Sequence, residues 1–123
     1  MSVLLESKLN IPLLGRGKVR DTYDLGKYML IVASDRISAF DSVLPNGIPD
    51  KGAVLNLLSA FWFKKTANIV PNHVVRVITE PSQLIKYFPS RTGYPAYLAN
   101  RSMVVNKAER IPVECVVRGY ISG

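Results

Sequence analysis

Residues 18–33 carry the sequence KVRDTYDLGKYMLIVA, and this stretch decides the fold. Its second half, 28–33, is a short apolar run typical of a buried strand, and residues 18–25 are predicted to form the strand before it. The two residues between them, Gly26-Lys27, place glycine first, which suits a type II′ hairpin turn. The preceding Gly15-Arg16-Gly17 is expected to form a loop at the edge of this hairpin.

A helix is predicted over residues 53–68. Its large apolar residues recur every three or four positions and form one face, which we expect to pack on the core. These residues are Val54, Leu57, Leu58, Phe61 and Trp62.

The rest of the chain is predicted to contain strands over 73–79, 102–107 and 111–121, with a short helix over 81–88. The lone Cys115 lies within the last apolar run and is expected to be a buried apolar residue. The order of hairpin, helix, strand, short helix and strands favours an α+β fold with an antiparallel sheet.

Composition limits the classes of function. The chain has 123 residues, 48% of them hydrophobic, and no apolar run long enough to span a membrane. The first ten residues lack the pattern of a secretory signal, so a cytoplasmic location is expected. The net charge of +7 favours an anionic partner, but the basic residues form no block of the kind that binds nucleic acid as a tail.

The first candidate site is GRGKVRD, residues 15–21. A glycine-rich turn lets backbone amides approach phosphate oxygens. Lys18 and Arg20 alternate along the predicted strand and would point to the same face. The segment is therefore either a cradle for a triphosphate or an ordinary polar entry to the hairpin.

The second candidate is SDRISAFD, residues 34–41, directly after the apolar strand. Two carboxylates, a guanidinium and two hydroxyls at the end of a buried strand either bind a polar ligand or order their own loop. A third candidate is the terminal run, in which Glu114 and Arg118 share one face of the predicted strand. There the charges form an ion pair or meet a ligand.

Four motifs occur in order: GKVRDTY at 17–23, SDRISAFD at 34–41, IPDKG at 48–52 and IPVECVVRG at 111–119. Together they closely resemble the phosphoribosylaminoimidazole-succinocarboxamide synthase, or SAICAR synthetase, family, from about Leu14 onward. The resemblance implies a fold similar to ATP-grasp proteins and to the small lobe of protein kinases. It also implies a ligase that uses ATP to join L-aspartate to carboxyaminoimidazole ribotide, releasing ADP and phosphate, with Mg²⁺ as a cofactor.

The resemblance further implies roles for individual residues. The nucleotide-binding residues would be Gly15, Arg16, Gly17, Lys18, Val19, Arg20, Val104, Val105, Asn106, Lys107, Ala108 and Glu114. The residues on the ribotide and aspartate side would be Asp35, Ser38, Asp41, Lys51, Gly52, Arg118 and Gly123. Lys18 and Asp41 are the expected catalytic residues, and Arg118 is expected to clamp the ribotide phosphate.

Family members are expected to be about twice as long as this chain or longer, so we expect it to be the front part of the enzyme. Residues 1–106 would form the nucleotide-binding lobe, and 107–123 the hinge and the start of a second lobe. The magnesium-binding acidic residues are expected beyond this chain, and a homo-oligomer is possible. The alternatives are a non-catalytic nucleotide- or ribotide-binding module and a small basic nucleic-acid-binding domain.

Overall fold

The computed structural model describes residues 2–121 and has one antiparallel five-stranded sheet in the order β1-β2-β3-β7-β6. These strands are β1 (Leu13–Arg16), β2 (Arg20–Asp24), β3 (Tyr28–Ala33), β6 (Val74–Ile78) and β7 (Ser102–Asn106). The other elements are the hairpin of β4 (Arg36–Ala39) and β5 (Ser42–Gly47), the helix α1 (Lys51–Lys65), and the 3₁₀ helices η1 (Pro81–Lys86) and η2 (Ala96–Leu98). The predicted α+β class with an antiparallel sheet is confirmed.

The predicted hairpin is also confirmed, since β2 pairs with β3 from Arg20 opposite Ala33 to Asp24 opposite Met29. Gly26 in its turn has a φ of +84°, a conformation that few residues other than glycine adopt. The expected loop at 15–17 is wrong for its first two residues. Gly15 and Arg16 belong to β1 and pair with β2, so the loop itself is only residues 17–19.

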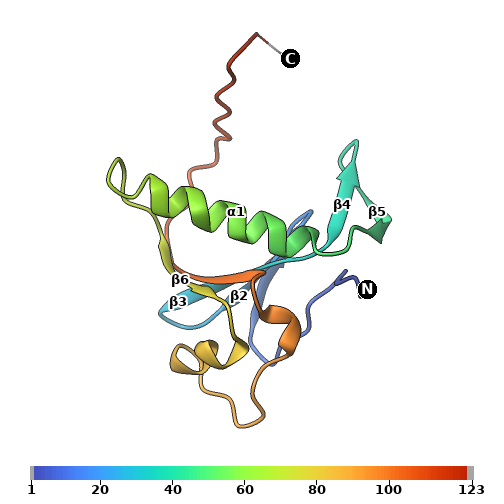
Figure 1. Cartoon of the computed structure of the whole chain (residues 1–123), viewed down its shortest axis with the longest axis vertical. Helices are drawn as coiled ribbons and strands as arrows, with labels where there is room; N and C mark the ends of the chain where they lie inside the picture. The colour runs from blue at the N-terminus through green and yellow to red at the C-terminus, as the bar shows by residue number, and fades with distance from the viewer. Residues whose placement is uncertain (1, 122–123) are drawn as a thin grey trace.

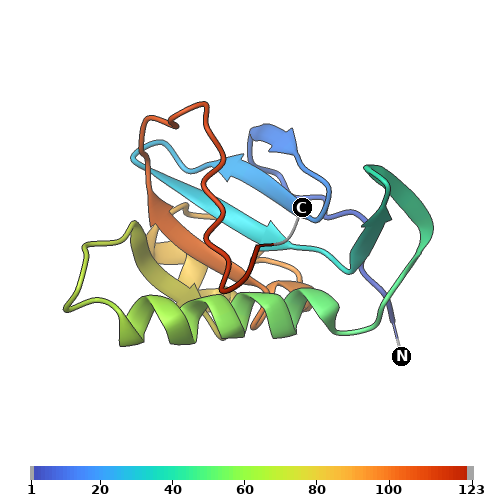
Figure 2. The same cartoon turned by 90° about the horizontal axis from the view of Figure 1, so that it is seen from above.

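The two faces of the sheet have different coverings. Leu30, Val32 and Val104 point to the side covered by η1 and η2, where they form the buried core with Leu84 and Leu98. Their neighbours along the strands alternate to the opposite face, where α1 lies (Figure 1). The core therefore sits on one side of the sheet, and α1 covers part of the other (Figure 2).

The predicted helix is present as α1, but its expected packing is wrong. Leu58 and Trp62 are 53% and 52% exposed, and the other three residues of the predicted apolar face are exposed as well. The buried helix residues are Gly52 and Asn56. Asn56 donates through Nδ2 to the carbonyl oxygens of Asn100 (3.0 Å) and Ser102 (3.3 Å). Small and polar contacts thus bring α1 close to the sheet, which turns its large apolar side chains outward.

Replacing Leu58 with glutamine is expected to change the free energy of unfolding by less than about 0.5 kcal/mol, because an exposed side chain loses little burial. Leu30→Ala, at a fully buried core position, is expected to cost about 2–5 kcal/mol. Urea denaturation followed by circular dichroism at several protein concentrations compares the two. If Leu58→Gln and Leu30→Ala lowered the free energy of unfolding equally at every protein concentration, Leu58 would be buried in solution and the expected exposure of this face of α1 would be wrong.

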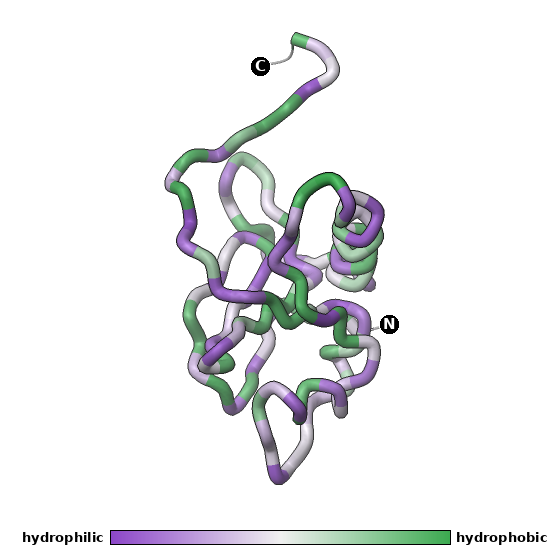
Figure 3. Tube along the Cα trace, turned by 90° about the vertical axis from the view of Figure 1, so that its left-hand side faces the viewer, coloured by the Kyte–Doolittle hydropathy of each residue, from purple (hydrophilic) through white to green (hydrophobic). Residues whose placement is uncertain are grey.

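Residues 107–121 contain neither helix nor strand and are exposed along their length. They extend away from the sheet on the α1 side, with hydrophobic and hydrophilic stretches alternating (Figures 1 and 3). The predicted strand at 111–121 and the predicted burial of Cys115 are therefore wrong. A strand needs a hydrogen-bonding partner, and β7, which precedes this segment, already has β3 and β6 on its two sides. Within residues 2–121, no helix has the length and apolarity needed to cross a bilayer.

Candidate functional site

The turn at residues 17–20 joins β1 to β2 directly above the paired Arg16 and Asp21. The N–H of Gly17 donates to the carbonyl of Arg20 at 2.7 Å. The next two amides, of Lys18 and Val19, make no hydrogen bond within residues 2–121, so both donors are free for an anion. The predicted alternation of Lys18 with Arg20 along a strand is wrong, because β2 begins only at Arg20.

Lys18 instead contacts the second candidate segment. Phe40 and Asp41 form the tip of the β4–β5 hairpin with φ values of 50° and 63°, the left-handed conformation that primed hairpin turns require. The Lys18 ammonium donates to the Asp41 carboxylate. This hydrogen bond and the charge of Asp41 raise the pKa of Lys18, with a smaller contribution from Glu114. Lys18 in turn lowers the pKa of Asp41. Lys18 is thus within electrostatic reach of two other predicted site residues, Asp41 and Glu114.

Asp35, by contrast, is fully buried. Its carboxylate accepts from the backbone N–H of Leu4 (2.9 Å) and of Gly52 (2.8 Å), and from Arg101 (2.9 Å). Burial alone would raise the pKa of Asp35, but these hydrogen bonds outweigh it and hold the pKa below its ordinary value. Of the two alternatives for this segment, the placement of Asp35 favours ordering the loop.

Asp21 is the second buried carboxylate, and sequence reasoning missed its role. Its oxygens accept from Arg16 (2.8 Å), from Arg36 (2.8 Å) and from both the backbone N–H and the hydroxyl of Ser7. Burial would raise the pKa of Asp21, but the hydrogen bonds from Arg36 and Ser7 lower it overall. The available signal was a charged residue on the same strand face as Tyr23, which is buried in the core.

The face of the sheet below the turn is partly open beside α1. Thr22, Met29 and Ile31 are half-buried there, next to the buried Val105. A cavity of about 190 Å³ continues under α1. It is lined by Arg20, Ile31, Asn56, Ser59, Phe63, His73 and Met103. The apolar side chains of Met29 and Ile31 on this face suit contact with the face of an aromatic ring.

The predicted nucleotide-binding residues at the end of β7 divide into two groups. Val104 and Val105 pair with β3 on one side and β6 on the other, and the N–H of Asn106 donates to the carbonyl of His73. Lys107 and Ala108 lie just past the strand, where their backbone is outside the sheet. The Lys107 ammonium pairs with Asp24 at 2.8 Å, and this contact lowers the pKa of Asp24.

The other predicted residues are more scattered. Ser38 lies in β4 and Lys51 begins α1, and both are half-buried. Arg118 is exposed on the extended segment and forms no ion pair with Glu114 in the part of the chain that the structure describes. The final predicted residue, Gly123, lies outside the described residues.

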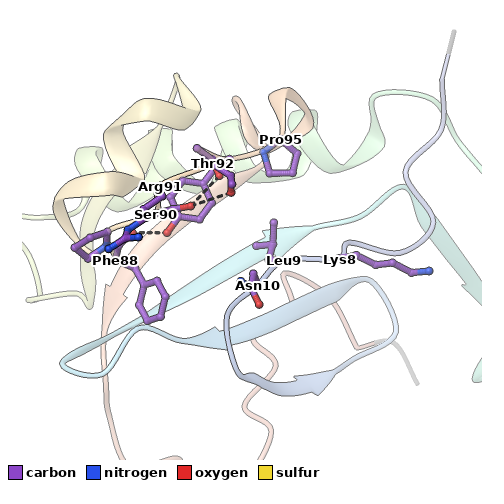
Figure 4. A pocket seen from close by; sticks show the side chains of 11 residues that line it. Lys8, Leu9, Asn10, Phe88, Ser90, Arg91, Thr92 and Pro95 are labelled. Atoms are coloured by element: carbon purple, nitrogen blue, oxygen red, sulfur yellow. Dashed lines mark hydrogen bonds between the residues drawn. The ribbon is translucent and has the colours of Figure 1, made fainter.

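A separate cavity of about 660 Å³ lies between residues 8–10 and 88–95. It contains two basic residues, but Lys8 extends away from Arg91 (Figure 4). The two cations therefore do not converge on one ligand, and the 17–20 turn remains the better candidate for an anion. Residues 2–121 contain no group of three or more His, Cys, Asp or Glu side chains that could hold a metal ion.

Comparison with known proteins decides the family. The sequence profile described as SAICAR synthetase matches residues 13–123. The chain belongs to the SAICAR synthetase family. It is 54% identical over 118 residues to the phosphoribosylaminoimidazole-succinocarboxamide synthase of Elusimicrobium minutum, and 53% identical over 115 residues to that of Geobacter metallireducens.

A solved structure supports the same assignment. The SAICAR synthase from Saccharomyces cerevisiae, complexed with SAICAR, matches with a TM-score of 0.84 and 44% identity, over 98% of this chain and 42% of that one. The two bacterial matches cover 95% and 93% of this chain, but only 39% and 37% of the relatives. The chain therefore spans about two fifths of the length of the SAICAR synthetases that it matches.

Proposed function

We propose that this chain provides the nucleotide-binding part of an ATP-dependent ligase, which joins L-aspartate to carboxyaminoimidazole ribotide and gives SAICAR, ADP and phosphate. Family membership supports the reaction. The observation that supports nucleotide binding by this chain is the 17–20 turn. Two free amides and an exposed ammonium meet there, the combination that binds phosphate. A cytoplasmic location follows from the same proposal.

In this proposal, the nucleotide lies on the open face of the sheet. The amides of Lys18 and Val19 and the Lys18 ammonium hold the phosphates. The adenine rests on the surface of Thr22, Met29 and Ile31, and the backbone of Lys107-Ala108 meets its edge. The order β1-β2-β3-β7-β6, with α1 between β5 and β6, supports the further proposal of a fold similar to ATP-grasp proteins and the kinase small lobe.

The chemistry proceeds in two displacements. A carboxylate oxygen of the ribotide attacks the γ-phosphorus of ATP and ADP leaves. The amine of aspartate then attacks the acyl carbon and phosphate leaves. Lys18 neutralises charge on the phosphates in the first step, and it exchanges Asp41 for a phosphate oxygen as the nucleotide enters. Mg²⁺ supplies further neutralisation in such transfers, but residues 2–121 gather no acidic cluster for it, so we assign it no ligand here.

The ribotide and aspartate side is proposed to include Ser38, Asp41 and Lys51, with Arg118 on the ribotide phosphate. Residues 107–121 would serve as the hinge that leads into a second lobe. Their exposure and lack of regular structure support this, since a segment with apolar side chains in solvent lacks a packing partner.

Removing the Lys18 ammonium should weaken ADP binding to this chain by about tenfold or more, because a hydrogen bond to a charged group is lost. Isothermal titration of ADP into the wild type and Lys18→Ala measures this. Lys27→Ala is the matched control, since it removes the same charge from the exposed turn between β2 and β3. Equal losses in both variants would contradict a specific role for Lys18.

The ligase itself is tested by ADP release from ATP and carboxyaminoimidazole ribotide, with and without L-aspartate. The Elusimicrobium minutum enzyme serves as the positive control. Aspartate-dependent release by the 123-residue chain would show that it is a working ligase. Nucleotide binding without release would assign it a binding role only.

A further inference from the structure

Arg36 is almost completely buried and contacts the turn at residues 17–20, which we call the phosphate turn. Its Nη2 donates to the carbonyl of Gly17 (3.0 Å), and its Nε donates to the carbonyl of Lys18 (3.3 Å). Its Nη1 donates to the carbonyl of Leu5 (2.7 Å), and Nη2 also contacts Asp21 (2.8 Å). One side chain thus ties two successive carbonyls of the turn to the buried carboxylate at its base.

Ser34 completes this arrangement. Its backbone N–H and its hydroxyl both donate to the carbonyl of Val19, at 2.8 and 2.7 Å. The hydroxyl also accepts from the backbone N–H of Arg36 at 3.3 Å. All three carbonyls of residues 17–19 are therefore held by a segment that follows β3, while the amides of Lys18 and Val19 stay without partners in residues 2–121.

We infer that Arg36, assisted by Ser34, is the positioning residue of the phosphate turn: it captures the carbonyl oxygens, so that only N–H donors face the phosphates. A backbone that presented its carbonyls there would repel a phosphate, because both carry negative charge on oxygen. Preorganised donors need no rearrangement when the anion arrives. The inference rests on the proposed nucleotide site and identifies the residues that fix the backbone of its turn.

Lysine cannot replace this guanidinium, because an ammonium is a single donor centre and cannot span the Gly17 and Lys18 carbonyls together with Asp21. Arg36→Lys keeps the positive charge beside Asp21 but loses the separate guanidinium donors that hold the Gly17 and Lys18 carbonyls. It is therefore expected to speed hydrogen exchange of the Gly17 amide, which donates to the carbonyl of Arg20, by about tenfold or more, while exchange in β3 and β7 stays as in the wild type.

Binding supplies the readout that a purely structural role would not change. In the 123-residue chain, Arg36→Lys is expected to weaken ADP binding by about tenfold and to leave adenosine binding unchanged, because only the phosphates use the turn. Arg91→Lys, which makes the same change at an exposed loop, is the control. Unchanged ADP affinity in Arg36→Lys would overturn the inference, as would an equal loss for adenosine.

Two further arms keep the result interpretable. If Arg36→Lys fails to fold, Ser34→Ala removes the hydroxyl contact to Val19, and it should show a smaller change in the same direction. If the wild type binds no ADP, the proposed nucleotide site fails, whereas the exchange rate of the Gly17 amide still decides whether Arg36 holds the turn. Unchanged exchange in the substituted chain would overturn the positioning role on its own.

Discussion

Replacing Asp35 with alanine is expected to cost about 3–5 kcal/mol, the usual effect of breaking a buried ion pair, which is a large part of the roughly 5–15 kcal/mol that stabilises a typical domain. Asp35 is fully buried, and its partner Arg101 is only 8% exposed. Without the carboxylate, the guanidinium of Arg101 stays buried without a counter-charge. The backbone N–H groups of Leu4 and Gly52 lose their acceptor as well.

Guanidinium chloride denaturation followed by circular dichroism measures the loss. Asp24→Ala is the matched control, because Asp24 also pairs with one basic residue, Lys107, but both side chains are partly exposed. Exposed pairs of this kind contribute about 1 kcal/mol or less. If both substitutions cost the same, burial would not be what makes the Asp35 pair important.

Protonating the buried carboxylates in acid should also lower the free energy of unfolding, and this loss should be reversible. The pKa values of Asp35 and Asp21 lie below their ordinary value of 3.8 in the folded protein, so the folded state binds these protons less readily than the unfolded chain. Their contribution is therefore complete above about pH 4, and it is lost as the pH falls through the folded-state pKa values. Asp35→Asn should flatten the part of this pH dependence that Asp35 provides.

Sequence patterns were sufficient for the central hairpin of the sheet, but not for β1, for residues 111–121 or for the orientation of α1. The apolar run at 28–33 and the glycine turn after Leu25 are local signals, and they placed β2 and β3 correctly. The outward face of α1 depends instead on long-range contacts of Gly52 and Asn56, such as the hydrogen bond from Asn56 to Asn100, which lies 44 positions further along the chain. A helical period shows that the helix has an apolar face, but it does not show which face the sheet receives.

The candidate site, too, was predicted only in part from the sequence. The motif around Lys18 drew attention to the 17–20 turn, and the structure adds Asp41 as its contact. Arg36 and Asp21 lie in the two candidate segments, but their roles were missed, because each acts through contacts with backbone and side chains from separate segments. A single sequence presents both as ordinary polar residues of a turn and a strand, and only the fold shows that they are buried.

Gly52 provides the sharpest test of whether a motif residue serves the ligand or the fold. A Cβ at this position would overlap the carbonyl oxygen of Ala33 and lie 2.6 Å from Nη1 of Arg101. Gly52→Ala is therefore expected to cost up to about 3 kcal/mol, because the start of α1 must move away from β3. The same movement would pull its backbone N–H away from Asp35.

Gly119→Ala is the control, since a Cβ there would meet no atom within 4 Å. Denaturation midpoints of the two variants measure the difference. If Gly52 served only the ribotide and aspartate side, where the family resemblance places it, its alanine variant would fold normally and lose affinity for those substrates alone. A loss of stability confined to Gly52→Ala would instead show that this glycine is required where helix and strand touch. The Lys51-Gly52 pair would then reach the ligand only through Lys51.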